Sequence, residues 1–491
     1  MQKIIPSKNY SGINIPSIFW IFVGVSTILI WAWVRMQKFK IINYWWVYPG
    51  HVFGQNLTLW LTFIAAIILL LTLFALSIKS RLAVVLGILV AIIIPIVFSH
   101  IIYTDSEWHT DFQRGPYEKV SYSYSKIFFE PHKNPTLVLL ENYNKFQENQ
   151  RIKTKNIDFS ITKGSISTHP PGHIIAYGYL GELVQSWQNN GRSQFLEKYL
   201  RGNQKVQGSV AYLQFILSVI IIVLGTFLLA FNLTKSRALS LVSAASVPLA
   251  PTFILFGARP DILIAAFFIF CFGFVTLLES RKFFVRTLGL VWLAVFSIIL
   301  LLLSFGMIII IPAILVFLIF RISLGKISTL SAFVSYLIYL TIIIATFYFF
   351  KIVTHYDYLY NFYLSLGHQL AISQQWQVSF FDSLDFNIYE TLPMFGLVAS
   401  LGAVWSLVSK NNNKYWWFSL FCFIIFALVD FSGRSRGENG RIWVFLAPFF
   451  IISATTFLSQ LGKNKFVAII LFILLLFQNL FFLKYFSVLN F

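Results

Sequence analysis

Three carboxylates and one histidine fall within a short polar stretch that directly follows an apolar run ending near residue 103. They are Asp105, Glu107, His109 and Asp111. A carboxylate at a membrane boundary has its pKa raised by partial desolvation or lowered by a cation, and either state suits a general base acting on a hydroxyl group. The same side chains offer oxygen and nitrogen ligands to a divalent cation, but without a fixed metal-binding spacing. A solvated loop start is the alternative interpretation.

A second candidate stretch reads Ser-Thr-His-Pro-Pro-Gly-His from Ser167 to His173. The two prolines fix φ and hold His169 extended, Gly172 relaxes the backbone, and the amphipathic run from 173 to 187 predicts a helix. A rigid turn that aims His169, His173 and free backbone N–H groups at one point is suited to binding an anion, because a helix N-terminus carries partial positive charge. The alternative is a proline-rich helix start with surface histidines.

A third candidate stretch, Gly433 to Trp443, is rich in glycine and carries Arg434, Arg436 and Arg441 just before an apolar run. Arginine binds phosphate through two parallel hydrogen bonds, and a cation entering the membrane is costly without a partner, so the arginines predict phosphate binding. Glu438 can instead pair with Arg441 and close the turn as a structural ion pair.

Two further segments have a weaker signal. In the short turn from Gly257 to Asp261, Asp261 is placed to cap the next helix and Arg259 is a second candidate phosphate contact. The segment from 355 to 390 has histidines and aspartates without motif spacing and is a candidate lid. Phosphate-loop, dinucleotide-binding, zinc-binding and G-x-S-x-G patterns do not occur in the sequence.

Composition shows what must position these residues. The 491 residues are 58% hydrophobic and 11% charged, with a mean hydropathy of +0.75, which excludes a soluble domain and predicts an all-α polytopic membrane protein. The net charge of +19 is spread over short connections, so membrane lipids are expected as partners and nucleic acid is not. The two cysteines, Cys271 and Cys422, lie in apolar runs and predict no disulfide. Most of the 54 phenylalanines are expected to face lipid or the interface.

Apolar runs predict about thirteen transmembrane helices. They span residues 16–35, 57–78, 82–103, 207–232, 238–257, 261–279, 287–303, 306–320, 328–353, 391–409, 415–430, 442–460 and 466–486. The first is interpreted as an uncleaved helix, and the short pair around Ser304 as two helices or one re-entrant hairpin.

Charge gives the predicted orientation. With a cytosolic amino terminus, every even-numbered connection is short and basic, and only the cluster from Arg35 to Lys40 violates the positive-inside rule. Glu279 is then the one acidic residue on the cytosolic side. We expect a multi-pass plasma-membrane protein with its active site on the outer face.

Five segments follow from this organisation. Residues 1–103 form three N-terminal helices, 104–206 a large outward-facing loop with short amphipathic helices and the first two candidate stretches, 207–353 the central helices, 354–390 a second outward loop, and 391–491 the C-terminal helices with the arginine-rich turn.

The acidic stretch, the His169-Pro170-Pro171-Gly172 turn and the arginine-rich turn resemble those of integral-membrane glycosyltransferases of the GT-C fold, which include protein O-mannosyltransferases and bacterial lipid A aminoarabinose transferases. The sequence departs from them in two extra helices before the acidic loop and in carboxylates that are not contiguous.

The resemblance implies an inverting transfer of a sugar from a polyprenyl-phosphate-linked donor to a lipid, glycan or protein acceptor. It implies that Asp105 or Asp111 is the base and that His169, Arg436 and Arg441 stabilise the departing phosphate. No cofactor is firmly implied, and a divalent cation stays open. The alternatives are a surface-polysaccharide polymerase or ligase, which the acidic stretch disfavours, and a lipid-linked saccharide flippase or other transporter, for which cations within helices or a repeated half are expected.

Overall fold

The computed structural model describes residues 57–102, 206–255, 261–375, 391–409, 415–431, 443–461 and 467–485, together with residues 25, 170–172, 175–176, 180, 257 and 387–388. Within these ranges the protein is helical and has no strand. The first helices are α2 (Leu57–Ser77), α3 (Arg81–Ile102), α9 (Val206–Thr234), α10 (Arg237–Ser246), η1 (Val247–Leu249), α11 (Pro251–Leu255), α12 (Asp261–Val275) and η2 (Thr276–Glu279). They are followed by α13 (Phe283–Leu303), η3 (Phe305–Ile309), α14 (Ile310–Ser323), α15 (Thr329–Thr354), α16 (Tyr358–Gln375), α18 (Leu397–Val408), α19 (Trp416–Phe431), η5 (Val444–Leu446), α21 (Ala447–Leu461) and α22 (Val467–Tyr485).

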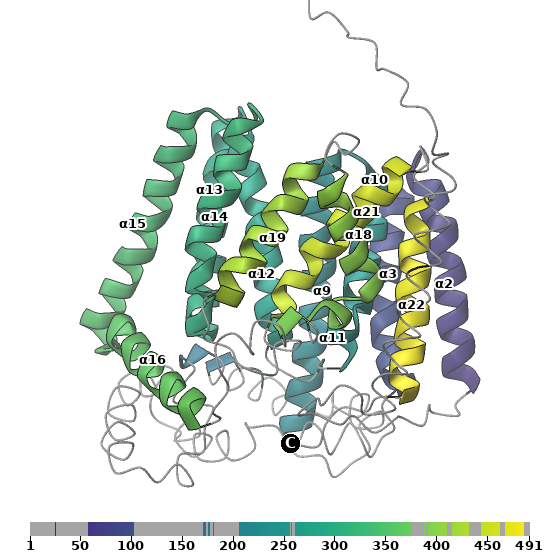
Figure 1. Cartoon of the computed structure of the whole chain (residues 1–491), viewed down its shortest axis with the longest axis horizontal. Coiled ribbons are helices and arrows are strands. Elements are labelled where there is room, and N and C mark those ends of the chain that lie inside the picture. The colour runs from purple at the N-terminus through teal and green to yellow at the C-terminus, as the bar shows by residue number, and fades with distance from the viewer. Residues whose placement is uncertain are drawn as a thin grey trace, which may run out of the picture.

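Seven helical spans are long and apolar enough to cross a membrane, and five shorter apolar helices accompany them in the described part of the chain. The helices stand side by side as a bundle (Figure 1). Large apolar side chains cover the outside of α2 and α15, as lipid contact requires. These features confirm an all-α polytopic membrane protein. Each predicted span after the first overlaps a described helix; span 16–35 lies outside the described residues except for Val25, so the count of about thirteen stays a prediction.

Two predicted spans are broken. The single helix expected over 238–257 is divided into α10, η1 and α11, because Pro248 and Pro251 cannot donate backbone hydrogen bonds. The span expected over 391–409 is interrupted before α18 at Gly396, whose φ of 101° is open mainly to glycine.

Amide side chains of α22 satisfy the backbone at both breaks. Gln478, which is buried, accepts a hydrogen bond from the Leu397 amide at 2.9 Å and donates one to the Pro393 carbonyl at 3.0 Å. Asn479 donates to the Leu249 carbonyl. Because an unpaired backbone group is costly in a membrane, these amides allow discontinuous helices at this depth.

The re-entrant hairpin considered around Ser304 is wrong. Spans of 21 and 19 residues, Phe283–Leu303 and Phe305–Ser323, lie on either side, and each is long enough to cross the membrane. Ser304 alone separates them in an extended conformation, with φ −152° and ψ 132°.

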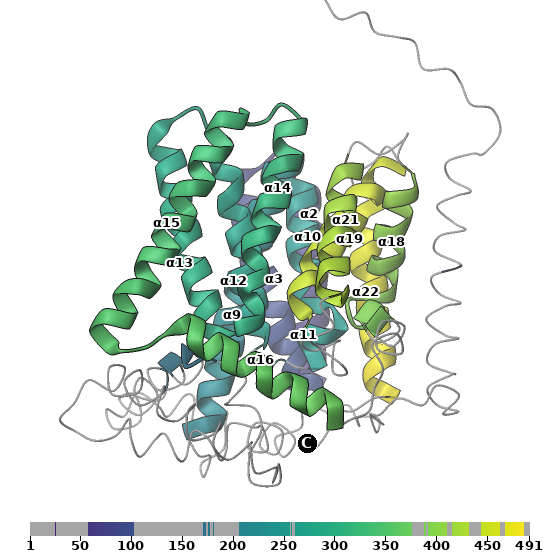
Figure 2. The same cartoon turned by 60° about the vertical axis from the view of Figure 1, so that its left-hand side comes forward.

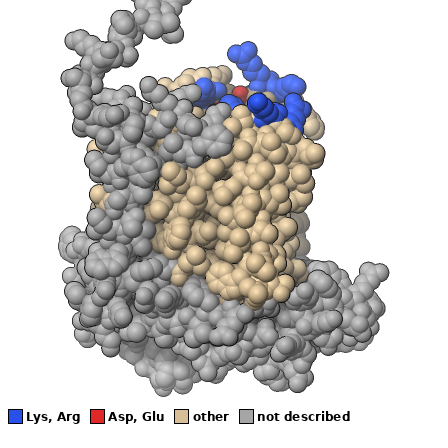
Figure 3. All heavy atoms as spheres, turned by 90° about the vertical axis from the view of Figure 1, so that its right-hand side faces the viewer, with Lys and Arg blue, Asp and Glu red and all other residues tan. Residues whose placement is uncertain are grey.

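The bundle has two different ends. Short connections at one end carry most of the described Lys and Arg side chains, which gather there in the space-filling view (Figure 3). We call this the basic end, and call the other, where α3 ends, α9 begins and α13 turns into η3, the distal end. At the distal end α16 leaves α15 at an angle and lies across the foot of the bundle (Figure 2).

Many phenylalanines lie inside the protein, and the expectation that most of the 54 face lipid or the interface stays a prediction. Phe268, Phe272, Phe317, Phe421 and Phe449 are buried and meet in edge-to-face and tilted pairs, with centroids 5.0–5.8 Å apart. This aromatic cluster joins α12, α14, α19 and α21 into the main core.

Candidate functional site at the distal end

The residues predicted to carry chemistry lie outside the described residues. They are Asp105, Glu107, His109, Asp111, His169, His173, Arg259, Arg434, Arg436, Glu438 and Arg441. Their mutual geometry therefore stays a prediction, but the chain segments that lead into and out of them are described. These segments define how the distal end is built.

The two helices that flank the first polar segment, residues 104–206, are in contact with each other. His100, in the last turn of α3, and Tyr212, in α9, share a hydrogen bond of 2.8 Å between Nε2 and the hydroxyl oxygen, and their rings are 5.4 Å apart. The end of α3 and the start of α9, which flank the hundred-odd residues between them, are thus neighbours at the distal end.

The Pro170-Pro171-Gly172 turn packs against the helix bundle. All three residues are buried, and the Ile175 amide donates to the Pro171 carbonyl at 3.0 Å, as in a first helical turn. A β-carbon on Gly172 would lie 2.3 Å from the Leu302 carbonyl oxygen and 2.5 Å from its carbon. Backbone therefore touches backbone where α13 ends at Leu303, and only glycine permits this approach. The expectation that Gly172 merely relaxes the chain is incomplete, because its missing side chain makes the docking possible.

A second contact joins the segment after α16 to the end of α19. The Asn387 amide nitrogen donates to the Asp430 carboxylate at 2.8 Å, and both residues are buried. Asp430 lies in the last turn of α19, just before the arginine-rich turn. On the other side of that turn, Trp443 is buried and packs edge-on against Phe426 at 5.5 Å, so both sides of the turn are fixed to the bundle.

The second polar segment, residues 354–390, contains the long helix α16, which was not expected from the sequence. Asp357 begins α16 by accepting a hydrogen bond from the Tyr360 amide at 3.1 Å, and it pairs with Lys351 of α15 at 2.7 Å. Burial alone raises the pKa of Asp357, but hydrogen bonds from Lys351 and from backbone amides outweigh burial and lower that pKa below its ordinary value. The corner between α15 and α16 also contains His355 in a left-handed conformation, with φ 57°.

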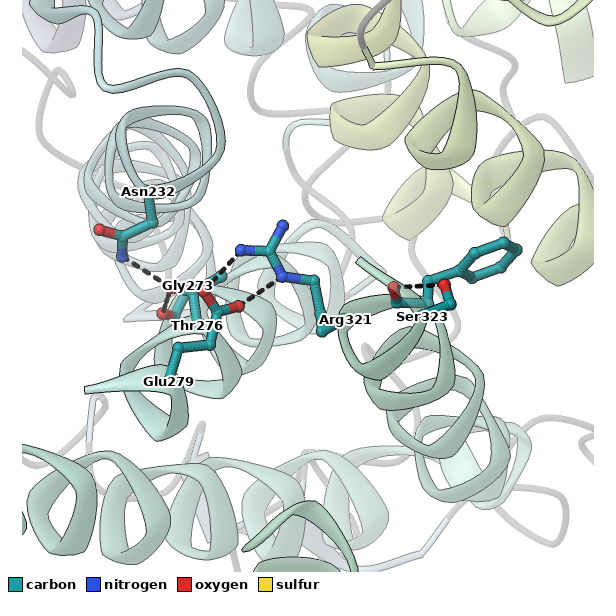
Figure 4. Close-up of polar contacts among 7 residues, drawn as sticks. Asn232, Gly273, Thr276, Glu279, Arg321 and Ser323 are labelled. Carbon is teal, nitrogen blue, oxygen red and sulfur yellow. Dashed lines mark hydrogen bonds and ion pairs between the residues drawn. The ribbon is translucent and has the colours of Figure 1, made fainter. Parts of the chain in front are cut away.

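A cluster of paired polar side chains lies at the basic end. The Arg321 guanidinium donates two hydrogen bonds of 2.5 Å to the Glu279 carboxylate and lies 5.1 Å from the centre of the Trp417 ring. Beside it Asn232 donates to Thr276 at 2.6 Å, and Figure 4 shows the two pairs together. Arg321 comes directly after the predicted span 306–320 and was thus expected in a short basic connection, but it belongs to α14 and is 4% exposed. The pair explains the one acidic residue expected on this side: Glu279 binds η2 to α14.

Metal binding is not supported by the described residues, which contain no group of three or more His, Cys, Asp or Glu side chains able to hold an ion. The candidate ligands Asp105, Glu107 and His109 lie outside them. Cys271 and Cys422 are free and buried in α12 and α19.

Comparisons with known proteins add no assignment. No model of a known protein family matches the chain. A comparison with curated proteins finds no match either.

Sequence signals existed for two of the contacts that the sequence analysis missed. Asp430 is the single carboxylate at the end of the apolar run Trp416–Phe431, and an ionisable residue in such a run is a functional candidate in its own right. Asp357, placed directly before a run of aromatic and aliphatic residues, is a recognisable helix cap. The docking of Gly172 onto Leu302 is a contact between distant segments, and no local pattern indicates it.

Proposed function

We propose that this protein is an inverting glycosyltransferase that moves a sugar from a polyprenyl-phosphate-linked donor to an acceptor hydroxyl group at the outer face of the membrane. The observation that supports this function most is the packing of Pro170–Gly172 against the end of α13. This contact attaches the segment with the candidate catalytic residues to the bundle at the distal end, opposite the basic turns. A lipid-linked donor needs its reacting atoms at this boundary, with its chain in the lipid phase.

The proposed chemistry uses the predicted residues in three roles. Asp105 or Asp111 takes the proton from the acceptor hydroxyl group, and the resulting oxygen attacks the anomeric carbon from the face opposite the phosphate. The bond from the anomeric carbon to the phosphate oxygen breaks, and the phosphate leaves on its lipid with the electron pair. His169, Arg436 and Arg441 stabilise the charge on that phosphate. Attack from the opposite face inverts the anomeric centre.

The orientation proposed for this reaction follows from charge. The basic end carries short turns rich in Lys and Arg, which the positive-inside rule places in the cytosol. The distal end then faces outward.

Substitution of the candidate bases tests this function. The assay measures transfer of radiolabelled sugar from a set of undecaprenyl-phosphate monosaccharides by the purified protein in liposomes. We expect one of Asp105→Ala and Asp111→Ala to abolish transfer while its expression and binding of undecaprenyl phosphate stay near those of the unmodified protein. Full transfer by both variants would show that neither residue is the base. Movement of intact donor across the liposome membrane without transfer would identify a flippase instead.

A further inference from the structure

Asp430 is a carboxylate enclosed at the distal end of an otherwise apolar helix. It is 5% exposed, and Asn387, its hydrogen-bond partner at 2.8 Å, is fully buried. Charged side chains in membrane-spanning helices are costly and occur mainly where they serve binding or transport. The Asp430–Asn387 pair therefore needs an explanation beyond packing.

The charge of Asp430 is not balanced within the described part of the chain. The ion pairs given by these residues are Arg321 with Glu279 and Lys351 with Asp357, and neither involves Asp430. The Asn387 amide satisfies one carboxylate oxygen, whereas an ionised carboxylate accepts several hydrogen bonds. The second oxygen has no partner in the described residues, and the side chain is not completely enclosed, since Asp430 is 5% exposed. A carboxylate with one oxygen bonded to the protein and the other without a described partner is suited to accept a hydrogen bond from a ligand.

We propose that Asp430, held in place by Asn387, forms a subsite that binds a hydroxyl group of a sugar. This inference rests on the proposed function and assigns Asp430 to the sugar of the lipid-linked donor. The carboxylate accepts a hydrogen bond from the hydroxyl group, while the buried Asn387 amide fixes the orientation of the carboxylate. Hydrogen bonds to an ionised carboxylate in a low-dielectric site are strong, so they fix which sugar is held and how.

A divalent cation is a poorer ligand for the same pair. One accessible carboxylate oxygen supplies far fewer than the six or more oxygen ligands that Ca²⁺ or Mg²⁺ takes. The Asn387 amide also points a donor hydrogen at the carboxylate, and the partial positive charge of that hydrogen opposes a cation there.

The position of the pair in the chain fits a donor sugar. Asp430 precedes by a few residues the arginine-rich turn proposed to bind phosphate, and Asn387 follows α16 in the second polar segment. In the donor the sugar is bonded directly to the phosphate, so groups that bind the two must be neighbours. Asp430 is thus assigned to sugar binding and selection, with Asn387 as its positioning residue, and not to the proton transfer.

Binding measurements on the purified full-length protein separate the sugar from the carrier. The probes are undecaprenyl phosphate alone and a set of undecaprenyl-phosphate hexoses, followed by thermal unfolding over a concentration series. For Asp430→Asn we expect an unchanged apparent Kd for undecaprenyl phosphate and a Kd about 10- to 100-fold higher for the preferred hexose conjugate, as for the loss of a hydrogen bond to a charged group. Asp357→Asn is the matched control: it makes the same change at the same end, in a residue paired to Lys351, and we expect both Kd values to stay unchanged.

The outcomes distinguish the two proposals. If Asp430→Asn retains the affinity of the hexose conjugate, the subsite is wrong while carrier binding still supports the transferase. If the unmodified protein binds no form of the carrier, the proposed function fails and the subsite fails with it. If added Mg²⁺ or Ca²⁺ stabilises the unmodified protein but not Asp430→Asn, the pair is a cation site and the sugar assignment is overturned.

Thiol labelling tests accessibility independently of affinity. Cys271 and Cys422 are buried, so Asp430→Cys adds a single reactive position without removal of native cysteines. We expect a small maleimide to label this variant and the preferred hexose conjugate, but not undecaprenyl phosphate alone, to slow labelling. Equal labelling rates with and without the conjugate, or no labelling at all, contradict a sugar subsite.

Discussion

The Gly172→Ala substitution tests the docking of the Pro-Pro-Gly turn. Its new β-carbon would lie 2.3 Å from the Leu302 carbonyl oxygen, whereas non-bonded carbon and oxygen atoms approach to about 3.3 Å. The difference of about 1 Å must be taken up by movement of the turn or of the end of α13. Neither can adjust cheaply, because the clash is between backbone atoms and not with the far end of a flexible side chain.

The expected effects follow from that displacement. Overpacking of a well-packed contact costs about 1–3 kcal/mol, so the midpoint of thermal unfolding falls. A catalytic group displaced by about 1 Å loses about 100-fold in rate, so under the proposed function transfer falls far more than stability does. Intrinsic tryptophan fluorescence during heating measures the first effect, and transfer from the preferred undecaprenyl-phosphate sugar measures the second.

Gly306→Ala is the matched control for this experiment. It makes the same change at the same junction, but its β-carbon meets only the Ser304 hydroxyl oxygen at 3.6 Å, an ordinary contact. We expect an unchanged or slightly higher midpoint and unchanged transfer, since alanine favours the helical conformation more than glycine does. A Gly172→Ala protein that matches Gly306→Ala in both measurements would refute the docking.

Three further predictions concern the rest of the bundle. Arg321→Met should lower the free energy of unfolding by about 3 kcal/mol, the low end of the cost of breaking a buried ion pair, because it leaves the half-buried Glu279 without a partner. Adding Glu279→Gln should recover part of the loss in a double-mutant cycle, and additive losses would contradict the pairing. Gln478→Leu should lower the free energy of unfolding by about 1–3 kcal/mol for each of the two backbone groups that lose their partner at the break before α18. Urea titration measures this loss, and an unchanged midpoint would show that these groups find other partners. The folded-state pKa of Asp357 is lowered, so its pair with Lys351 stabilises the protein above the unfolded-state pKa, and this stabilisation is lost as pH falls through the folded-state pKa. Asp357→Asn should therefore reduce the loss of stability at acid pH. Identical profiles of stability against pH for the variant and the unmodified protein would contradict this.

Hydropathy predicted where helices run but not where they break. Apolar length determines a span, and the predicted bounds of α2, α3 and α15 agree with the structure within one or two residues. The breaks at Pro248 and Gly396 lie inside apolar runs whose hydropathy does not change there. They are stable because Gln478 and Asn479, far along the chain, satisfy the backbone.

The helix α16 escaped prediction because both of its faces mix polar and apolar residues. Asn361 and Ser365 are buried beside Tyr358 and Leu364, whereas Leu359 and Tyr363 are 70% and 72% exposed. A search for one apolar buried face therefore finds no clear helix. At the foot of a membrane bundle, exposed apolar side chains can lie in the lipid interface.

The candidate site was predictable as residue types but not as contacts. Local spacing identified carboxylates, histidines and arginines suited to sugar transfer, and these assignments stay predictions. The contacts of Gly172 with Leu302 and of Asn387 with Asp430 join segments separated by at least 43 positions, so no local pattern can reveal them. Which phenylalanines are buried could not be predicted for the same reason, since burial depends on which helices pack together.

Binding of undecaprenyl phosphate by the purified protein tests the central claim most directly. We expect the unmodified protein to be stabilised against heat in a concentration-dependent way, and we expect Arg441→Ala to lose most of that stabilisation. Lys282→Ala, which removes an exposed cation at the basic end, should retain it. No stabilisation of the unmodified protein, or equal stabilisation of all three proteins, would contradict a polyprenyl-phosphate-dependent transferase with its phosphate site at the arginine-rich turn.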